Sequence, residues 1–507
     1  MPDAAPVLLW FRNDLRLSDH AALAAALASG RRVVPVFVRD DAAAGAWAPG
    51  GASRWWLHHA LTALADALAA AGSGLVLRQG DAAAVIPALA RATGAAEVLA
   101  GIAIEPWARR QEAAVAAALA AQGTGFRRFR TASLFAPDAL RTQAGTGFAV
   151  YTPFARAART RAAEPGALRP PAPAPARIPS PPLPESDPLD SWGLLPRTPD
   201  WAGGLRRRWV PGAAGARARL AAFLADGLAD YAARRDLPGQ DGTSRLSPHL
   251  HFGEISPGEL WFAAAPEAAD GAPARSAEKF PPARGAEKFR AELLWREFAL
   301  HLLWHHPDLP EQPLRGAFAR LAWRHDPAAL AAWQRGRTGI PLVDAGMREL
   351  WQTGWMHNRV RMVVASFLVK HLLLPWQDGA AWFHDTLVDA DLAANAASWQ
   401  WVAGCGTDAA PYFRVFNPVL QGRKFDPDGA YVRRFVPELA RLDTPFLHAP
   451  WEAPAAALAR AGVRLGQDYP APIVDLSAGR ARALAAFAAL GAGTDAVAGR
   501  AAAEPVA

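Results

Sequence analysis

Short apolar runs alternate with Ala- and Leu-rich segments of helical period over residues 1–130. The runs predict strands at Val7–Phe11, Val33–Val38, Leu75–Arg78 and Glu97–Ala100. The segments between them predict helices at Asp19–Ser29, Ser53–Ala71, Ala82–Ala92 and Pro106–Ala121, with Ser53 and Asp81 as N-caps and Gly30 and Gly72 as stops. Strands that alternate with helices indicate βαβ units, so this part predicts a parallel, doubly wound sheet.

The turn after the first strand reads Trp10-Phe11-Arg12-Asn13-Asp14-Leu15-Arg16. It lacks the G-x-G-x-x-G fingerprint of dinucleotide-binding sheets. We therefore expect any ligand at the carboxyl edge of this sheet to be held by another device.

The rest of the chain divides by composition. Residues 165–199 are rich in proline, which excludes helices and central strands, so they predict an extended linker. From about residue 215 to 480 the period is helical. The predicted organisation is an α/β domain over 1–135, a linker over 136–214, an all-α domain over 215–485 and a disordered tail over 486–507.

Composition narrows the function classes. The lone Cys405 excludes a disulfide framework and a Cys-based zinc site, and the His spacings predict no metal site. No long apolar span or secretion signal is evident, so we expect a cytoplasmic protein without membrane contact. The net charge of +7 allows a polyanionic partner. However, 50 of the 54 basic residues are Arg, which codon bias alone could produce.

Four segments carry candidate chemistry. In 385–401, Asp391 and Asn395 share a helix face that Trp399 continues, and the clustered aromatic residues beside it favour a lined pocket over a solvated face. Gly242–Pro248 combines hydroxyls with an Arg and suits a phosphate, although it also reads as an ordinary loop. Two further segments, Trp355–Met362 and Glu292–Phe298, have polar and aromatic residues at helical spacings. The first contains Arg and His, and the second contains Glu and Trp. Each also fits a plain surface helix, and in the second helix Glu292 would then pair with Arg296.

Together these segments resemble the photolyase/cryptochrome family, most closely its class I-type bacterial enzymes for cyclobutane pyrimidine dimers. The resemblance rests on Gly242–Pro248, Glu292–Phe298, Gly354–Met362 and Asp389–Pro418, in the family's order, with Leu9–Leu17 as an N-terminal match. It implies a Rossmann-like N-terminal antenna domain, a Pro-rich linker and a C-terminal helical domain that holds FAD. The implied reaction is light-driven electron transfer from reduced FAD, which splits pyrimidine dimers flipped out of UV-damaged DNA.

The resemblance also implies residue roles. The flavin contacts would be Tyr231, Thr243, Ser244, Arg245, Leu246, Ser247, Phe289, Arg361, Asp389, Asp391 and Asn395, with Asn395 facing the flavin N5. The lesion and DNA contacts would be Arg235, Glu292, Trp295, Asn358, Arg359, Met362, Trp401 and Gln421. The electron relay from flavin to surface would be Trp399, Trp376 and Trp323, which accounts for three of the 20 Trp.

The antenna region departs from the family pattern. Of the element Asn-Arg-x-Tyr-Glu-Pro only Glu105-Pro106 remains, which puts folate binding in doubt. Four possibilities stay open for the second chromophore: a methenyltetrahydrofolate, a deazaflavin, a flavin, or none. We expect the protein to act as a monomer.

Three alternatives stay open at this point. A cryptochrome would share the fold and FAD; plant-type members carry Asp at the position of Asn395 and often a long extension, whereas about 27 residues follow 480 here. A (6-4) photolyase would carry a second His where Asn358 stands. A nucleic-acid-binding protein without flavin would be colourless when purified.

Overall fold

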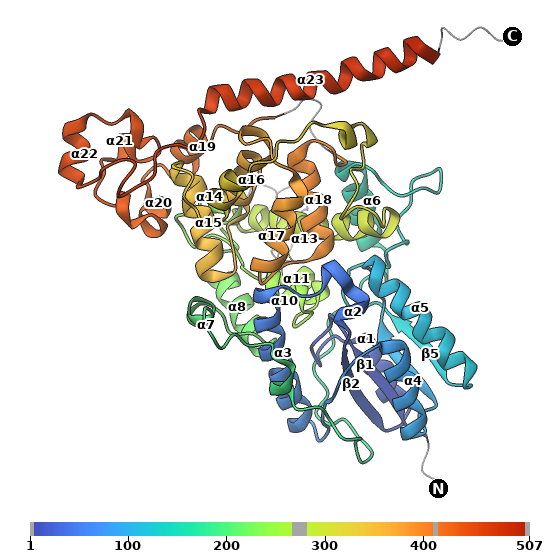
Figure 1. The fold of residues 1–507 in the computed structure, drawn as a ribbon. Helices are drawn as coiled ribbons and strands as arrows, with labels where there is room; N and C mark the ends of the chain where they lie inside the picture. The colour runs from blue at the N-terminus through green and yellow to red at the C-terminus, as the bar shows by residue number, and fades with distance from the viewer. Residues whose placement is uncertain (1–4, 266–280, 409–413, 502–507) are drawn as a thin grey trace, which may run out of the picture. The chain divides into compact units, whose positions relative to one another are not determined.

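The computed structural model describes residues 5–265, 281–408 and 414–501, which form two compact units (Figure 1). The first unit consists of Met1–Ala233, Thr243–Pro307 and His384–Ala394. The second unit consists of Arg234–Gly242, Asp308–Phe383 and Asn395–Ala507. Five residues of the family-like segment at 406–418, residues 409–413, lie outside the described part of the chain.

The sheet of the first unit is parallel throughout. Its strands are β1 (Val7–Phe11), β2 (Val33–Arg39), β3 (Val76–Gln79), β4 (Glu97–Gly101) and β5 (Gly125–Phe129), in the order β3-β2-β1-β4-β5. This confirms the predicted doubly wound α/β sheet. The four strands inferred from apolar runs are present within one or two residues. The sequence analysis missed β5, because its Gly-Phe-Arg-Arg-Phe run is charged and lies at the sheet edge.

Helices cover both faces of this sheet. Those in the N-terminal half are α1 (Ala21–Ala28), α2 (Asp41–Ala44), α3 (Gly51–Ala70), α4 (Ala82–Thr93) and α5 (Pro106–Ala121). Successive strand residues point to opposite faces. Leu8 and Trp10 therefore pack with Ile86 and Val115 of α4 and α5, whereas Phe11 meets His20 at the start of α1, with ring centroids 5.1 Å apart.

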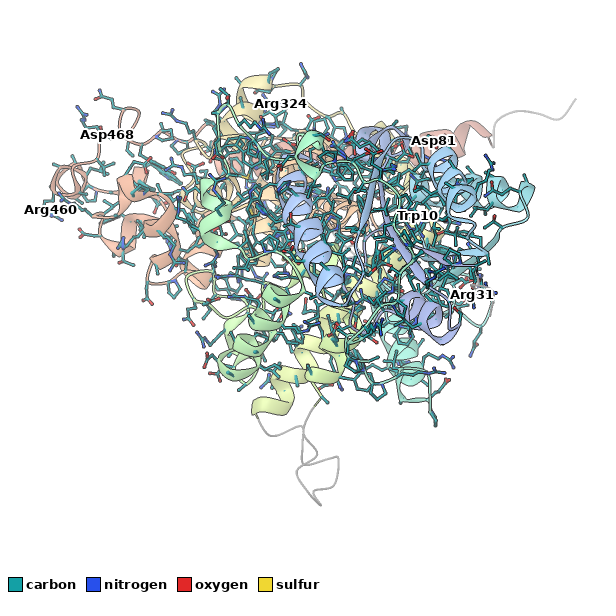
Figure 2. The ribbon with its side chains drawn as sticks, turned by 90° about the horizontal axis from the view of Figure 1, so that it is seen from below. Trp10, Arg31, Asp81, Arg324, Arg460 and Asp468 are labelled. Atoms are coloured by element: carbon teal, nitrogen blue, oxygen red, sulfur yellow. The ribbon has the colours of Figure 1, made fainter. Side chains whose placement is uncertain are left out.

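The burial of Trp10 shows how this core is made. Trp10 is 1% exposed and lies within the strands, whereas the labelled Arg31 and Asp81 of the same unit lie at its periphery (Figure 2). Asp81 accepts a hydrogen bond from the N–H of Ala83 at 2.9 Å, which confirms it as the N-cap of α4. The predicted N-cap Ser53 is wrong: α3 begins at Gly51, and Ser53 donates to the carbonyl of Leu387 instead.

The Pro-rich segment 165–199 runs along the sheet without regular structure apart from the short helix η2 (Leu189–Trp192). Backbone hydrogen bonds join Pro179 to Val33 and Ile178 to Ala71. These bonds supply partners for an extended backbone that cannot form its own helix. The linker is thus packed onto the first unit over part of its length.

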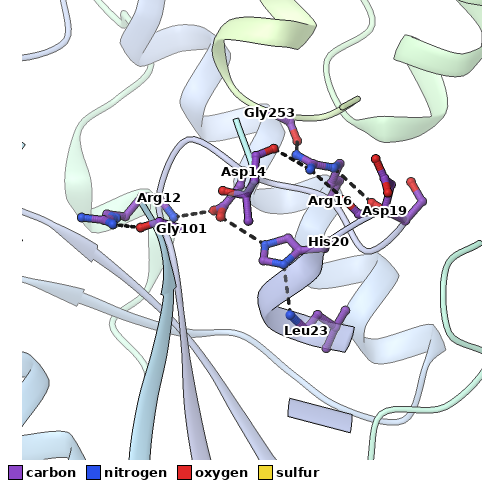
Figure 3. A network of polar contacts seen from close by, with 10 residues as sticks. Arg12, Asp14, Arg16, Asp19, His20, Leu23, Gly101 and Gly253 are labelled. Atoms are coloured by element: carbon purple, nitrogen blue, oxygen red, sulfur yellow. Dashed lines mark hydrogen bonds and ion pairs between the residues drawn. The ribbon is translucent and has the colours of Figure 1, made fainter. Parts of the chain in front are cut away.

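The first unit also contains helices from the middle of the chain. They are α6 (Tyr151–Ala163), α7 (Gly203–Arg208), α8 (Ala213–Asp226), α9 (Tyr231–Arg234), α10 (Ser247–His251), α11 (Pro257–Ala263) and α13 (Pro281–His305). A buried turn after β1 ties α10 to the sheet: Arg16 donates to the carbonyls of Gly253 and Thr131 at 3.0 and 2.7 Å (Figure 3).

Asp14 and Gly253 complete this junction. Asp14 accepts from the backbone N–H of Arg12 and pairs with His20 at 3.2 Å, as Figure 3 shows. Burial opposes ionisation of Asp14, but His20, the Arg12 N–H and Arg16 together hold its pKa well below the ordinary value. Gly253 has φ +65°, and a Cβ there would overlap the backbone of Asn13 and Asp14. The family-like Leu9–Leu17 segment therefore has a structural role here.

The second unit is helical, and no β-strand is assigned among its described residues. Its helices are α14 (Pro327–Gln334), α15 (Pro341–Thr353), α16 (Asn358–Ser366), α17 (Trp376–Thr386), α18 (Leu392–Ala403), α19 (Pro418–Phe425), α20 (Ala430–Phe435), α21 (Thr444–Leu447), α22 (Ala455–Ala461) and α23 (Leu476–Ala501). Three helices have residues in both units: α9 and α18 begin in the first unit and end in the second, and α17 begins in the second unit and ends in the first. The charged residues Arg324, Arg460 and Asp468 lie at the surface of this unit (Figure 2).

Helix α23 includes part of the segment expected to be a disordered tail, in keeping with the high helix propensity of its Ala residues. Across the described ranges, no helix combines the length and apolar character that a membrane span requires.

Candidate functional site

The loop before α10 gathers the phosphate-type donors predicted from Gly242–Pro248. Ser247 donates to Asp389 Oδ2 at 2.6 Å, so two predicted flavin contacts 142 positions apart are in direct contact. Arg219 donates to the carbonyl of Ser244 at 2.9 Å, and Arg245 is buried with φ +52°. A non-glycine residue in this left-handed region is held there by its surroundings.

Tyr231 and Phe289 lie together in an aromatic cluster. Their ring centroids are 5.6 Å apart at 86°, and Phe223 packs on both, at 5.5 Å from Tyr231 and 4.8 Å from Phe289. Phe289 is 4% exposed, so it acts here as a core residue that supports Tyr231. The sequence analysis did not identify Phe223.

Asp391 caps α18. Its Oδ1 accepts from the N–H of Ala394 at 2.8 Å, and its own N–H donates to the carbonyl of Asp389 at 2.7 Å. The two carboxylates are thus held by a tight turn and a helix start. Asp389 is buried at 7% exposure, which leaves a desolvated acceptor next to Ser247.

Helix α13 carries Glu292 and Trp295 one turn apart. Lys288 Nζ lies 3.5 Å from Glu292 Oε1, which makes an i,i+4 ion pair on this helix. Arg296 lies 3.6 Å from Glu297 and donates to the carbonyl of Ala132. Glu292 therefore stays partly exposed beside the 37% exposed indole of Trp295.

Trp295 is covered on one side by Tyr151, at the start of α6. The two rings are stacked, with centroids 3.5 Å apart and planes at 4°. The sequence analysis placed Tyr151 in the linker and missed it. The signal that could have found it is the aromatic residue in Tyr151-Thr-Pro-Phe154, which opens a helix inside that segment.

In the second unit, α16 holds Asn358, Arg359, Arg361 and Met362. Its N-cap is His357, whose side chain accepts from the N–H of Arg359. Burial lowers the pKa of His357 to about 4, so the ring is neutral near pH 7 and keeps the lone pair that this cap uses. The helix that carries these predicted flavin and DNA contacts thus begins at a cap that was not predicted from the sequence.

Arg359 and Arg235 meet at one carboxylate. Arg359 Nη2 lies 3.0 Å from Asp236 Oδ1, and Arg235 Nε lies 3.8 Å from the same atom. The guanidinium of Arg359 also lies 4.4 Å above the ring of Phe425 on α19, the helix that carries Gln421. The structure therefore brings two predicted DNA contacts, Arg235 and Arg359, to one carboxylate, and Asp236 offsets part of their charge.

Asn395 and Arg361 each have a fixed orientation. Asn395 Nδ2 donates to the carbonyl of Ala380 at 2.9 Å, which assigns its Oδ1 as the acceptor for another partner. Arg361 Nε donates to the carbonyl of Met356 at 2.7 Å, and its guanidinium lies 5.9 Å from the ring of Trp355.

The three predicted relay residues fall in the second unit. Trp399 and Trp376 are each 2% exposed, and Trp323 is partly exposed. Trp399 packs edge-on against Phe383 at 5.1 Å and against Trp333 at 6.2 Å. Trp401 is also in this unit, and its indole N–H donates to the carbonyl of Asp408. Two of the three predicted relay residues are therefore buried, and the third reaches the surface of the unit.

A cavity lies at the carboxyl ends of β1, β2 and β4, where the strand order β2-β1-β4 makes the topological switch point of the sheet. Ligands of open α/β sheets bind at such points. Its lining includes Arg12, Asp40, Glu105, His251 and Asp391 together with Trp10, Trp47 and Trp107. The described part of the chain holds no cluster of three or more His, Cys, Asp or Glu side chains suited to a metal ion.

Glu105 is the titratable group of interest in this cavity. Burial, with a smaller effect of Asp391, raises the pKa of Glu105 to about 7, although Arg12 acts in the opposite direction. Glu105 is thus partly neutral at pH 7 and offers an O–H donor as well as an acceptor.

The residues present fit a flavin dinucleotide. In the first unit, hydroxyl groups and a guanidinium at 243–247 match phosphate oxygens, and Asp389 and Asp391 match hydroxyl or imide donors. In the second unit, taken by itself, the acceptor of Asn395 matches an N–H.

Comparison with known proteins supports this assignment. Residues 7–176 match the family description "DNA photolyase", and residues 289–489 match "FAD binding domain of DNA photolyase". A deoxyribodipyrimidine photo-lyase of Agrobacterium fabrum is 48% identical over 489 residues, covering 96% of this chain and 98% of the relative. Cryptochrome-1 of Arabidopsis thaliana is 36% identical over 488 residues, covering 94% of this chain and 69% of the cryptochrome.

A solved structure agrees over almost the whole length. The crystal structure titled a bacterial class III photolyase from Agrobacterium tumefaciens has a TM-score of 0.89 at 48% identity and covers 96% of this chain and 98% of that chain. The sheet, the helical FAD-binding region and these matches lead to one conclusion: the chain belongs to the photolyase/cryptochrome family.

Proposed function

We propose that the chain is a deoxyribodipyrimidine photo-lyase, which uses light to split cyclobutane pyrimidine dimers in DNA. The observation that carries this proposal is the 48% identity to a protein of that name over 98% of its length. The more distant identity of 36% to a cryptochrome leaves signalling as the alternative. Asn395, where plant-type cryptochromes carry Asp, favours repair.

The subclass follows the same comparison. The motifs led us to expect a class I-type enzyme, whereas the solved structure at 48% identity is titled a class III photolyase. We therefore propose class III for this chain.

Bound reduced FAD would supply the electron that opens the dimer and receive it back afterwards. The chain's own groups bind and orient. Residues 243–247 would hold the phosphates, Asp389 and Asp391 would orient the polar edge, and Asn395 Oδ1 would accept from the N5–H of the reduced ring. No side chain needs to act as a nucleophile in this reaction.

The lesion pocket would bind the dimer by aromatic stacking and by a hydrogen bond with one carboxyl side chain. Trp295 and Trp401 would stack on the dimer bases, with about 1–3 kcal/mol per base available from such contacts. Glu292 would hydrogen-bond a base, and Met362 would pack beside it. Arg235, Asn358, Arg359 and Gln421 would contact the DNA, so affinity should fall as salt rises.

We further propose that the cavity at β1, β2 and β4 holds a second chromophore. Its aromatic and charged lining suits a planar polar ligand. The candidates remain a methenyltetrahydrofolate, a deazaflavin and a flavin. An absorption spectrum of the native protein, before and after its chromophores are released, distinguishes them.

The proposed division into an antenna domain, linker, FAD-binding domain and tail follows the predicted boundaries at 135, 214 and 485. A monomeric state and a cytoplasmic location complete the proposal, the latter in keeping with the single buried Cys405. Light scattering of the purified protein tests the monomer.

The decisive experiment follows dimers in irradiated DNA incubated with flavin-loaded, chemically reduced protein. Blue light should remove the dimers, and the dark control should leave them unchanged. A flavin-loaded protein that leaves dimers intact under light would refute repair and favour the signalling alternative. A colourless purified protein would favour the flavin-free nucleic-acid-binding alternative.

A further inference from the structure

The phenol ring of Tyr151 contacts α13 at two points. Its ring is stacked on the indole of Trp295, with centroids 3.5 Å apart and planes at 4°. Its hydroxyl donates to the carbonyl of Ala291 at 2.8 Å. In an α-helix, the carbonyl of residue 291 also accepts from the N–H of residue 295, so both contacts fall on the same helical turn.

A third ring completes the arrangement. Phe298 lies edge-on to both partners, 5.9 Å from Tyr151 at 68° and 6.0 Å from Trp295 at 72°. Phe298 is 2% exposed and belongs to the core, whereas Trp295 is 37% exposed. The exposed indole is therefore held by a buried ring at its edge and by Tyr151 across its face.

This arrangement is unlike an ordinary surface tryptophan. An exposed Trp on a helix samples several rotamers, and a ligand that stacks on it must pay for ordering the ring. The flat contact with Tyr151 and the hydroxyl bond to Ala291 restrict the indole in advance. Restricting a binding group in its bound orientation strengthens binding without adding a contact to the ligand.

We propose that Tyr151 is a positioning residue of the lesion pocket, which holds the indole of Trp295 in the orientation that stacks on the pyrimidine dimer. This inference rests on the proposed repair function and on the predicted role of Trp295. Tyr151 acts through Trp295, so its effect should appear in lesion affinity and disappear when Trp295 is removed.

The test compares Tyr151→Phe and Tyr151→Leu in the flavin-loaded full chain. The probes are an oligonucleotide with one cyclobutane dimer and the same oligonucleotide undamaged. Tyr151→Leu should raise Kd for the dimer about tenfold with little change for undamaged DNA, because preorganisation is lost. Tyr151→Phe keeps the stacked ring and loses only the hydroxyl bond to Ala291, so its Kd for the dimer should lie between those of the wild type and Tyr151→Leu.

A double-mutant cycle separates positioning from general damage to the fold. In a Trp295→Ala background, Tyr151→Leu should have no further effect on the Kd for the dimer. The rate of repair at saturating DNA and light should change much less than Kd. Should Tyr151→Leu fail to fold or to retain flavin, Tyr151→Met replaces it in the same cycle.

Two results would overturn the inference: an unchanged Kd in the Tyr151→Leu protein, or an equal loss of affinity with and without Trp295. Both presuppose a wild type that repairs dimers in light. A wild type that neither binds nor repairs dimers would instead refute the proposed function.

Discussion

The indole of Trp399 lies directly against the backbone of Gly379 on α17. A Cβ added at Gly379 would lie 2.6 Å from both Cζ2 and Cζ3 of Trp399, closer than real Cβ contacts allow. The helical backbone at this position therefore sets where the first residue of the predicted relay lies.

Gly379→Ala should displace this indole or strain the helix that it packs on. Overpacking of this kind costs about 1–3 kcal/mol of unfolding free energy. Photoreduction of the oxidised flavin should also slow, because the first relay ring moves. Gly316→Ala is the matched control, since a Cβ there has no heavy atom within 4 Å. Equal melting temperatures and photoreduction rates for the two variants would contradict this account.

Trp376→Phe should slow photoreduction of oxidised flavin while sparing repair by chemically reduced enzyme. Phenylalanine fills most of the buried site but does not lose an electron as readily as indole. Flash illumination followed by flavin absorbance measures the first effect, and dimer repair after dithionite reduction measures the second. Trp192→Phe, a buried tryptophan of the first unit, is the control. Unchanged photoreduction in Trp376→Phe would exclude Trp376 from the relay.

Glu105→Gln should stabilise the protein at alkaline pH. The pKa of Glu105 is raised to about 7 in the folded state from 4.5, so the folded state binds more protons than the unfolded state between these values. Stability is therefore lost as pH rises from about 4.5 to 7, and the loss is complete above 7. This pKa shift corresponds to a loss of at most about 3 kcal/mol in the free energy of unfolding.

The measurement for Glu105 is denaturant unfolding of wild type and Glu105→Gln at pH 5 and pH 8, both without the second chromophore. The unfolding free energy of Glu105→Gln should exceed that of the wild type by more at pH 8 than at pH 5. A difference in unfolding free energy that does not change with pH would show that the carboxyl titrates normally.

Glu292→Gln should weaken lesion binding, because an amide replaces a charged hydrogen-bond acceptor. Hydrogen bonds to charged groups contribute about 1.5–3 kcal/mol, which corresponds to roughly 10–100-fold in Kd. Titration with dimer-containing oligonucleotides checks this.

The neighbouring Lys288→Gln serves as the control for Glu292. Lys288 and Glu292 form an i,i+4 pair with 45% and 27% exposed side chains, and such pairs contribute about 0.3–0.5 kcal/mol. Lys288→Gln should leave lesion affinity near that of the wild type. A loss as large as that of Glu292→Gln would mean that the ion pair, rather than the carboxylate on the base, is the important interaction.

Local patterns were sufficient for much of the fold. The apolar run Val7–Phe11 is a central strand buried on both faces, and Asp81 caps its helix, because both depend on near neighbours in the chain. The edge strand β5 was missed because Arg127 and Arg128 interrupt the apolar signal where one side of the strand is open to solvent. The family and the candidate site residues were inferred from the motif resemblance, because hydrophobic periodicity contains no information about either.

By itself the sequence determined the α/β and helical composition, the family and the identity of the candidate flavin, lesion and relay residues. Only the tertiary structure decided which of them meet. Ser247 reaches Asp389 across 142 positions, Tyr151 covers Trp295 from the segment we had assigned to the linker, and Asp236 holds both Arg235 and Arg359. The tertiary structure also buries Glu105, which raises the pKa of its carboxyl group to about 7. These relationships depend on packing between segments far apart in the chain, and burial and partner distance are properties that no local pattern encodes.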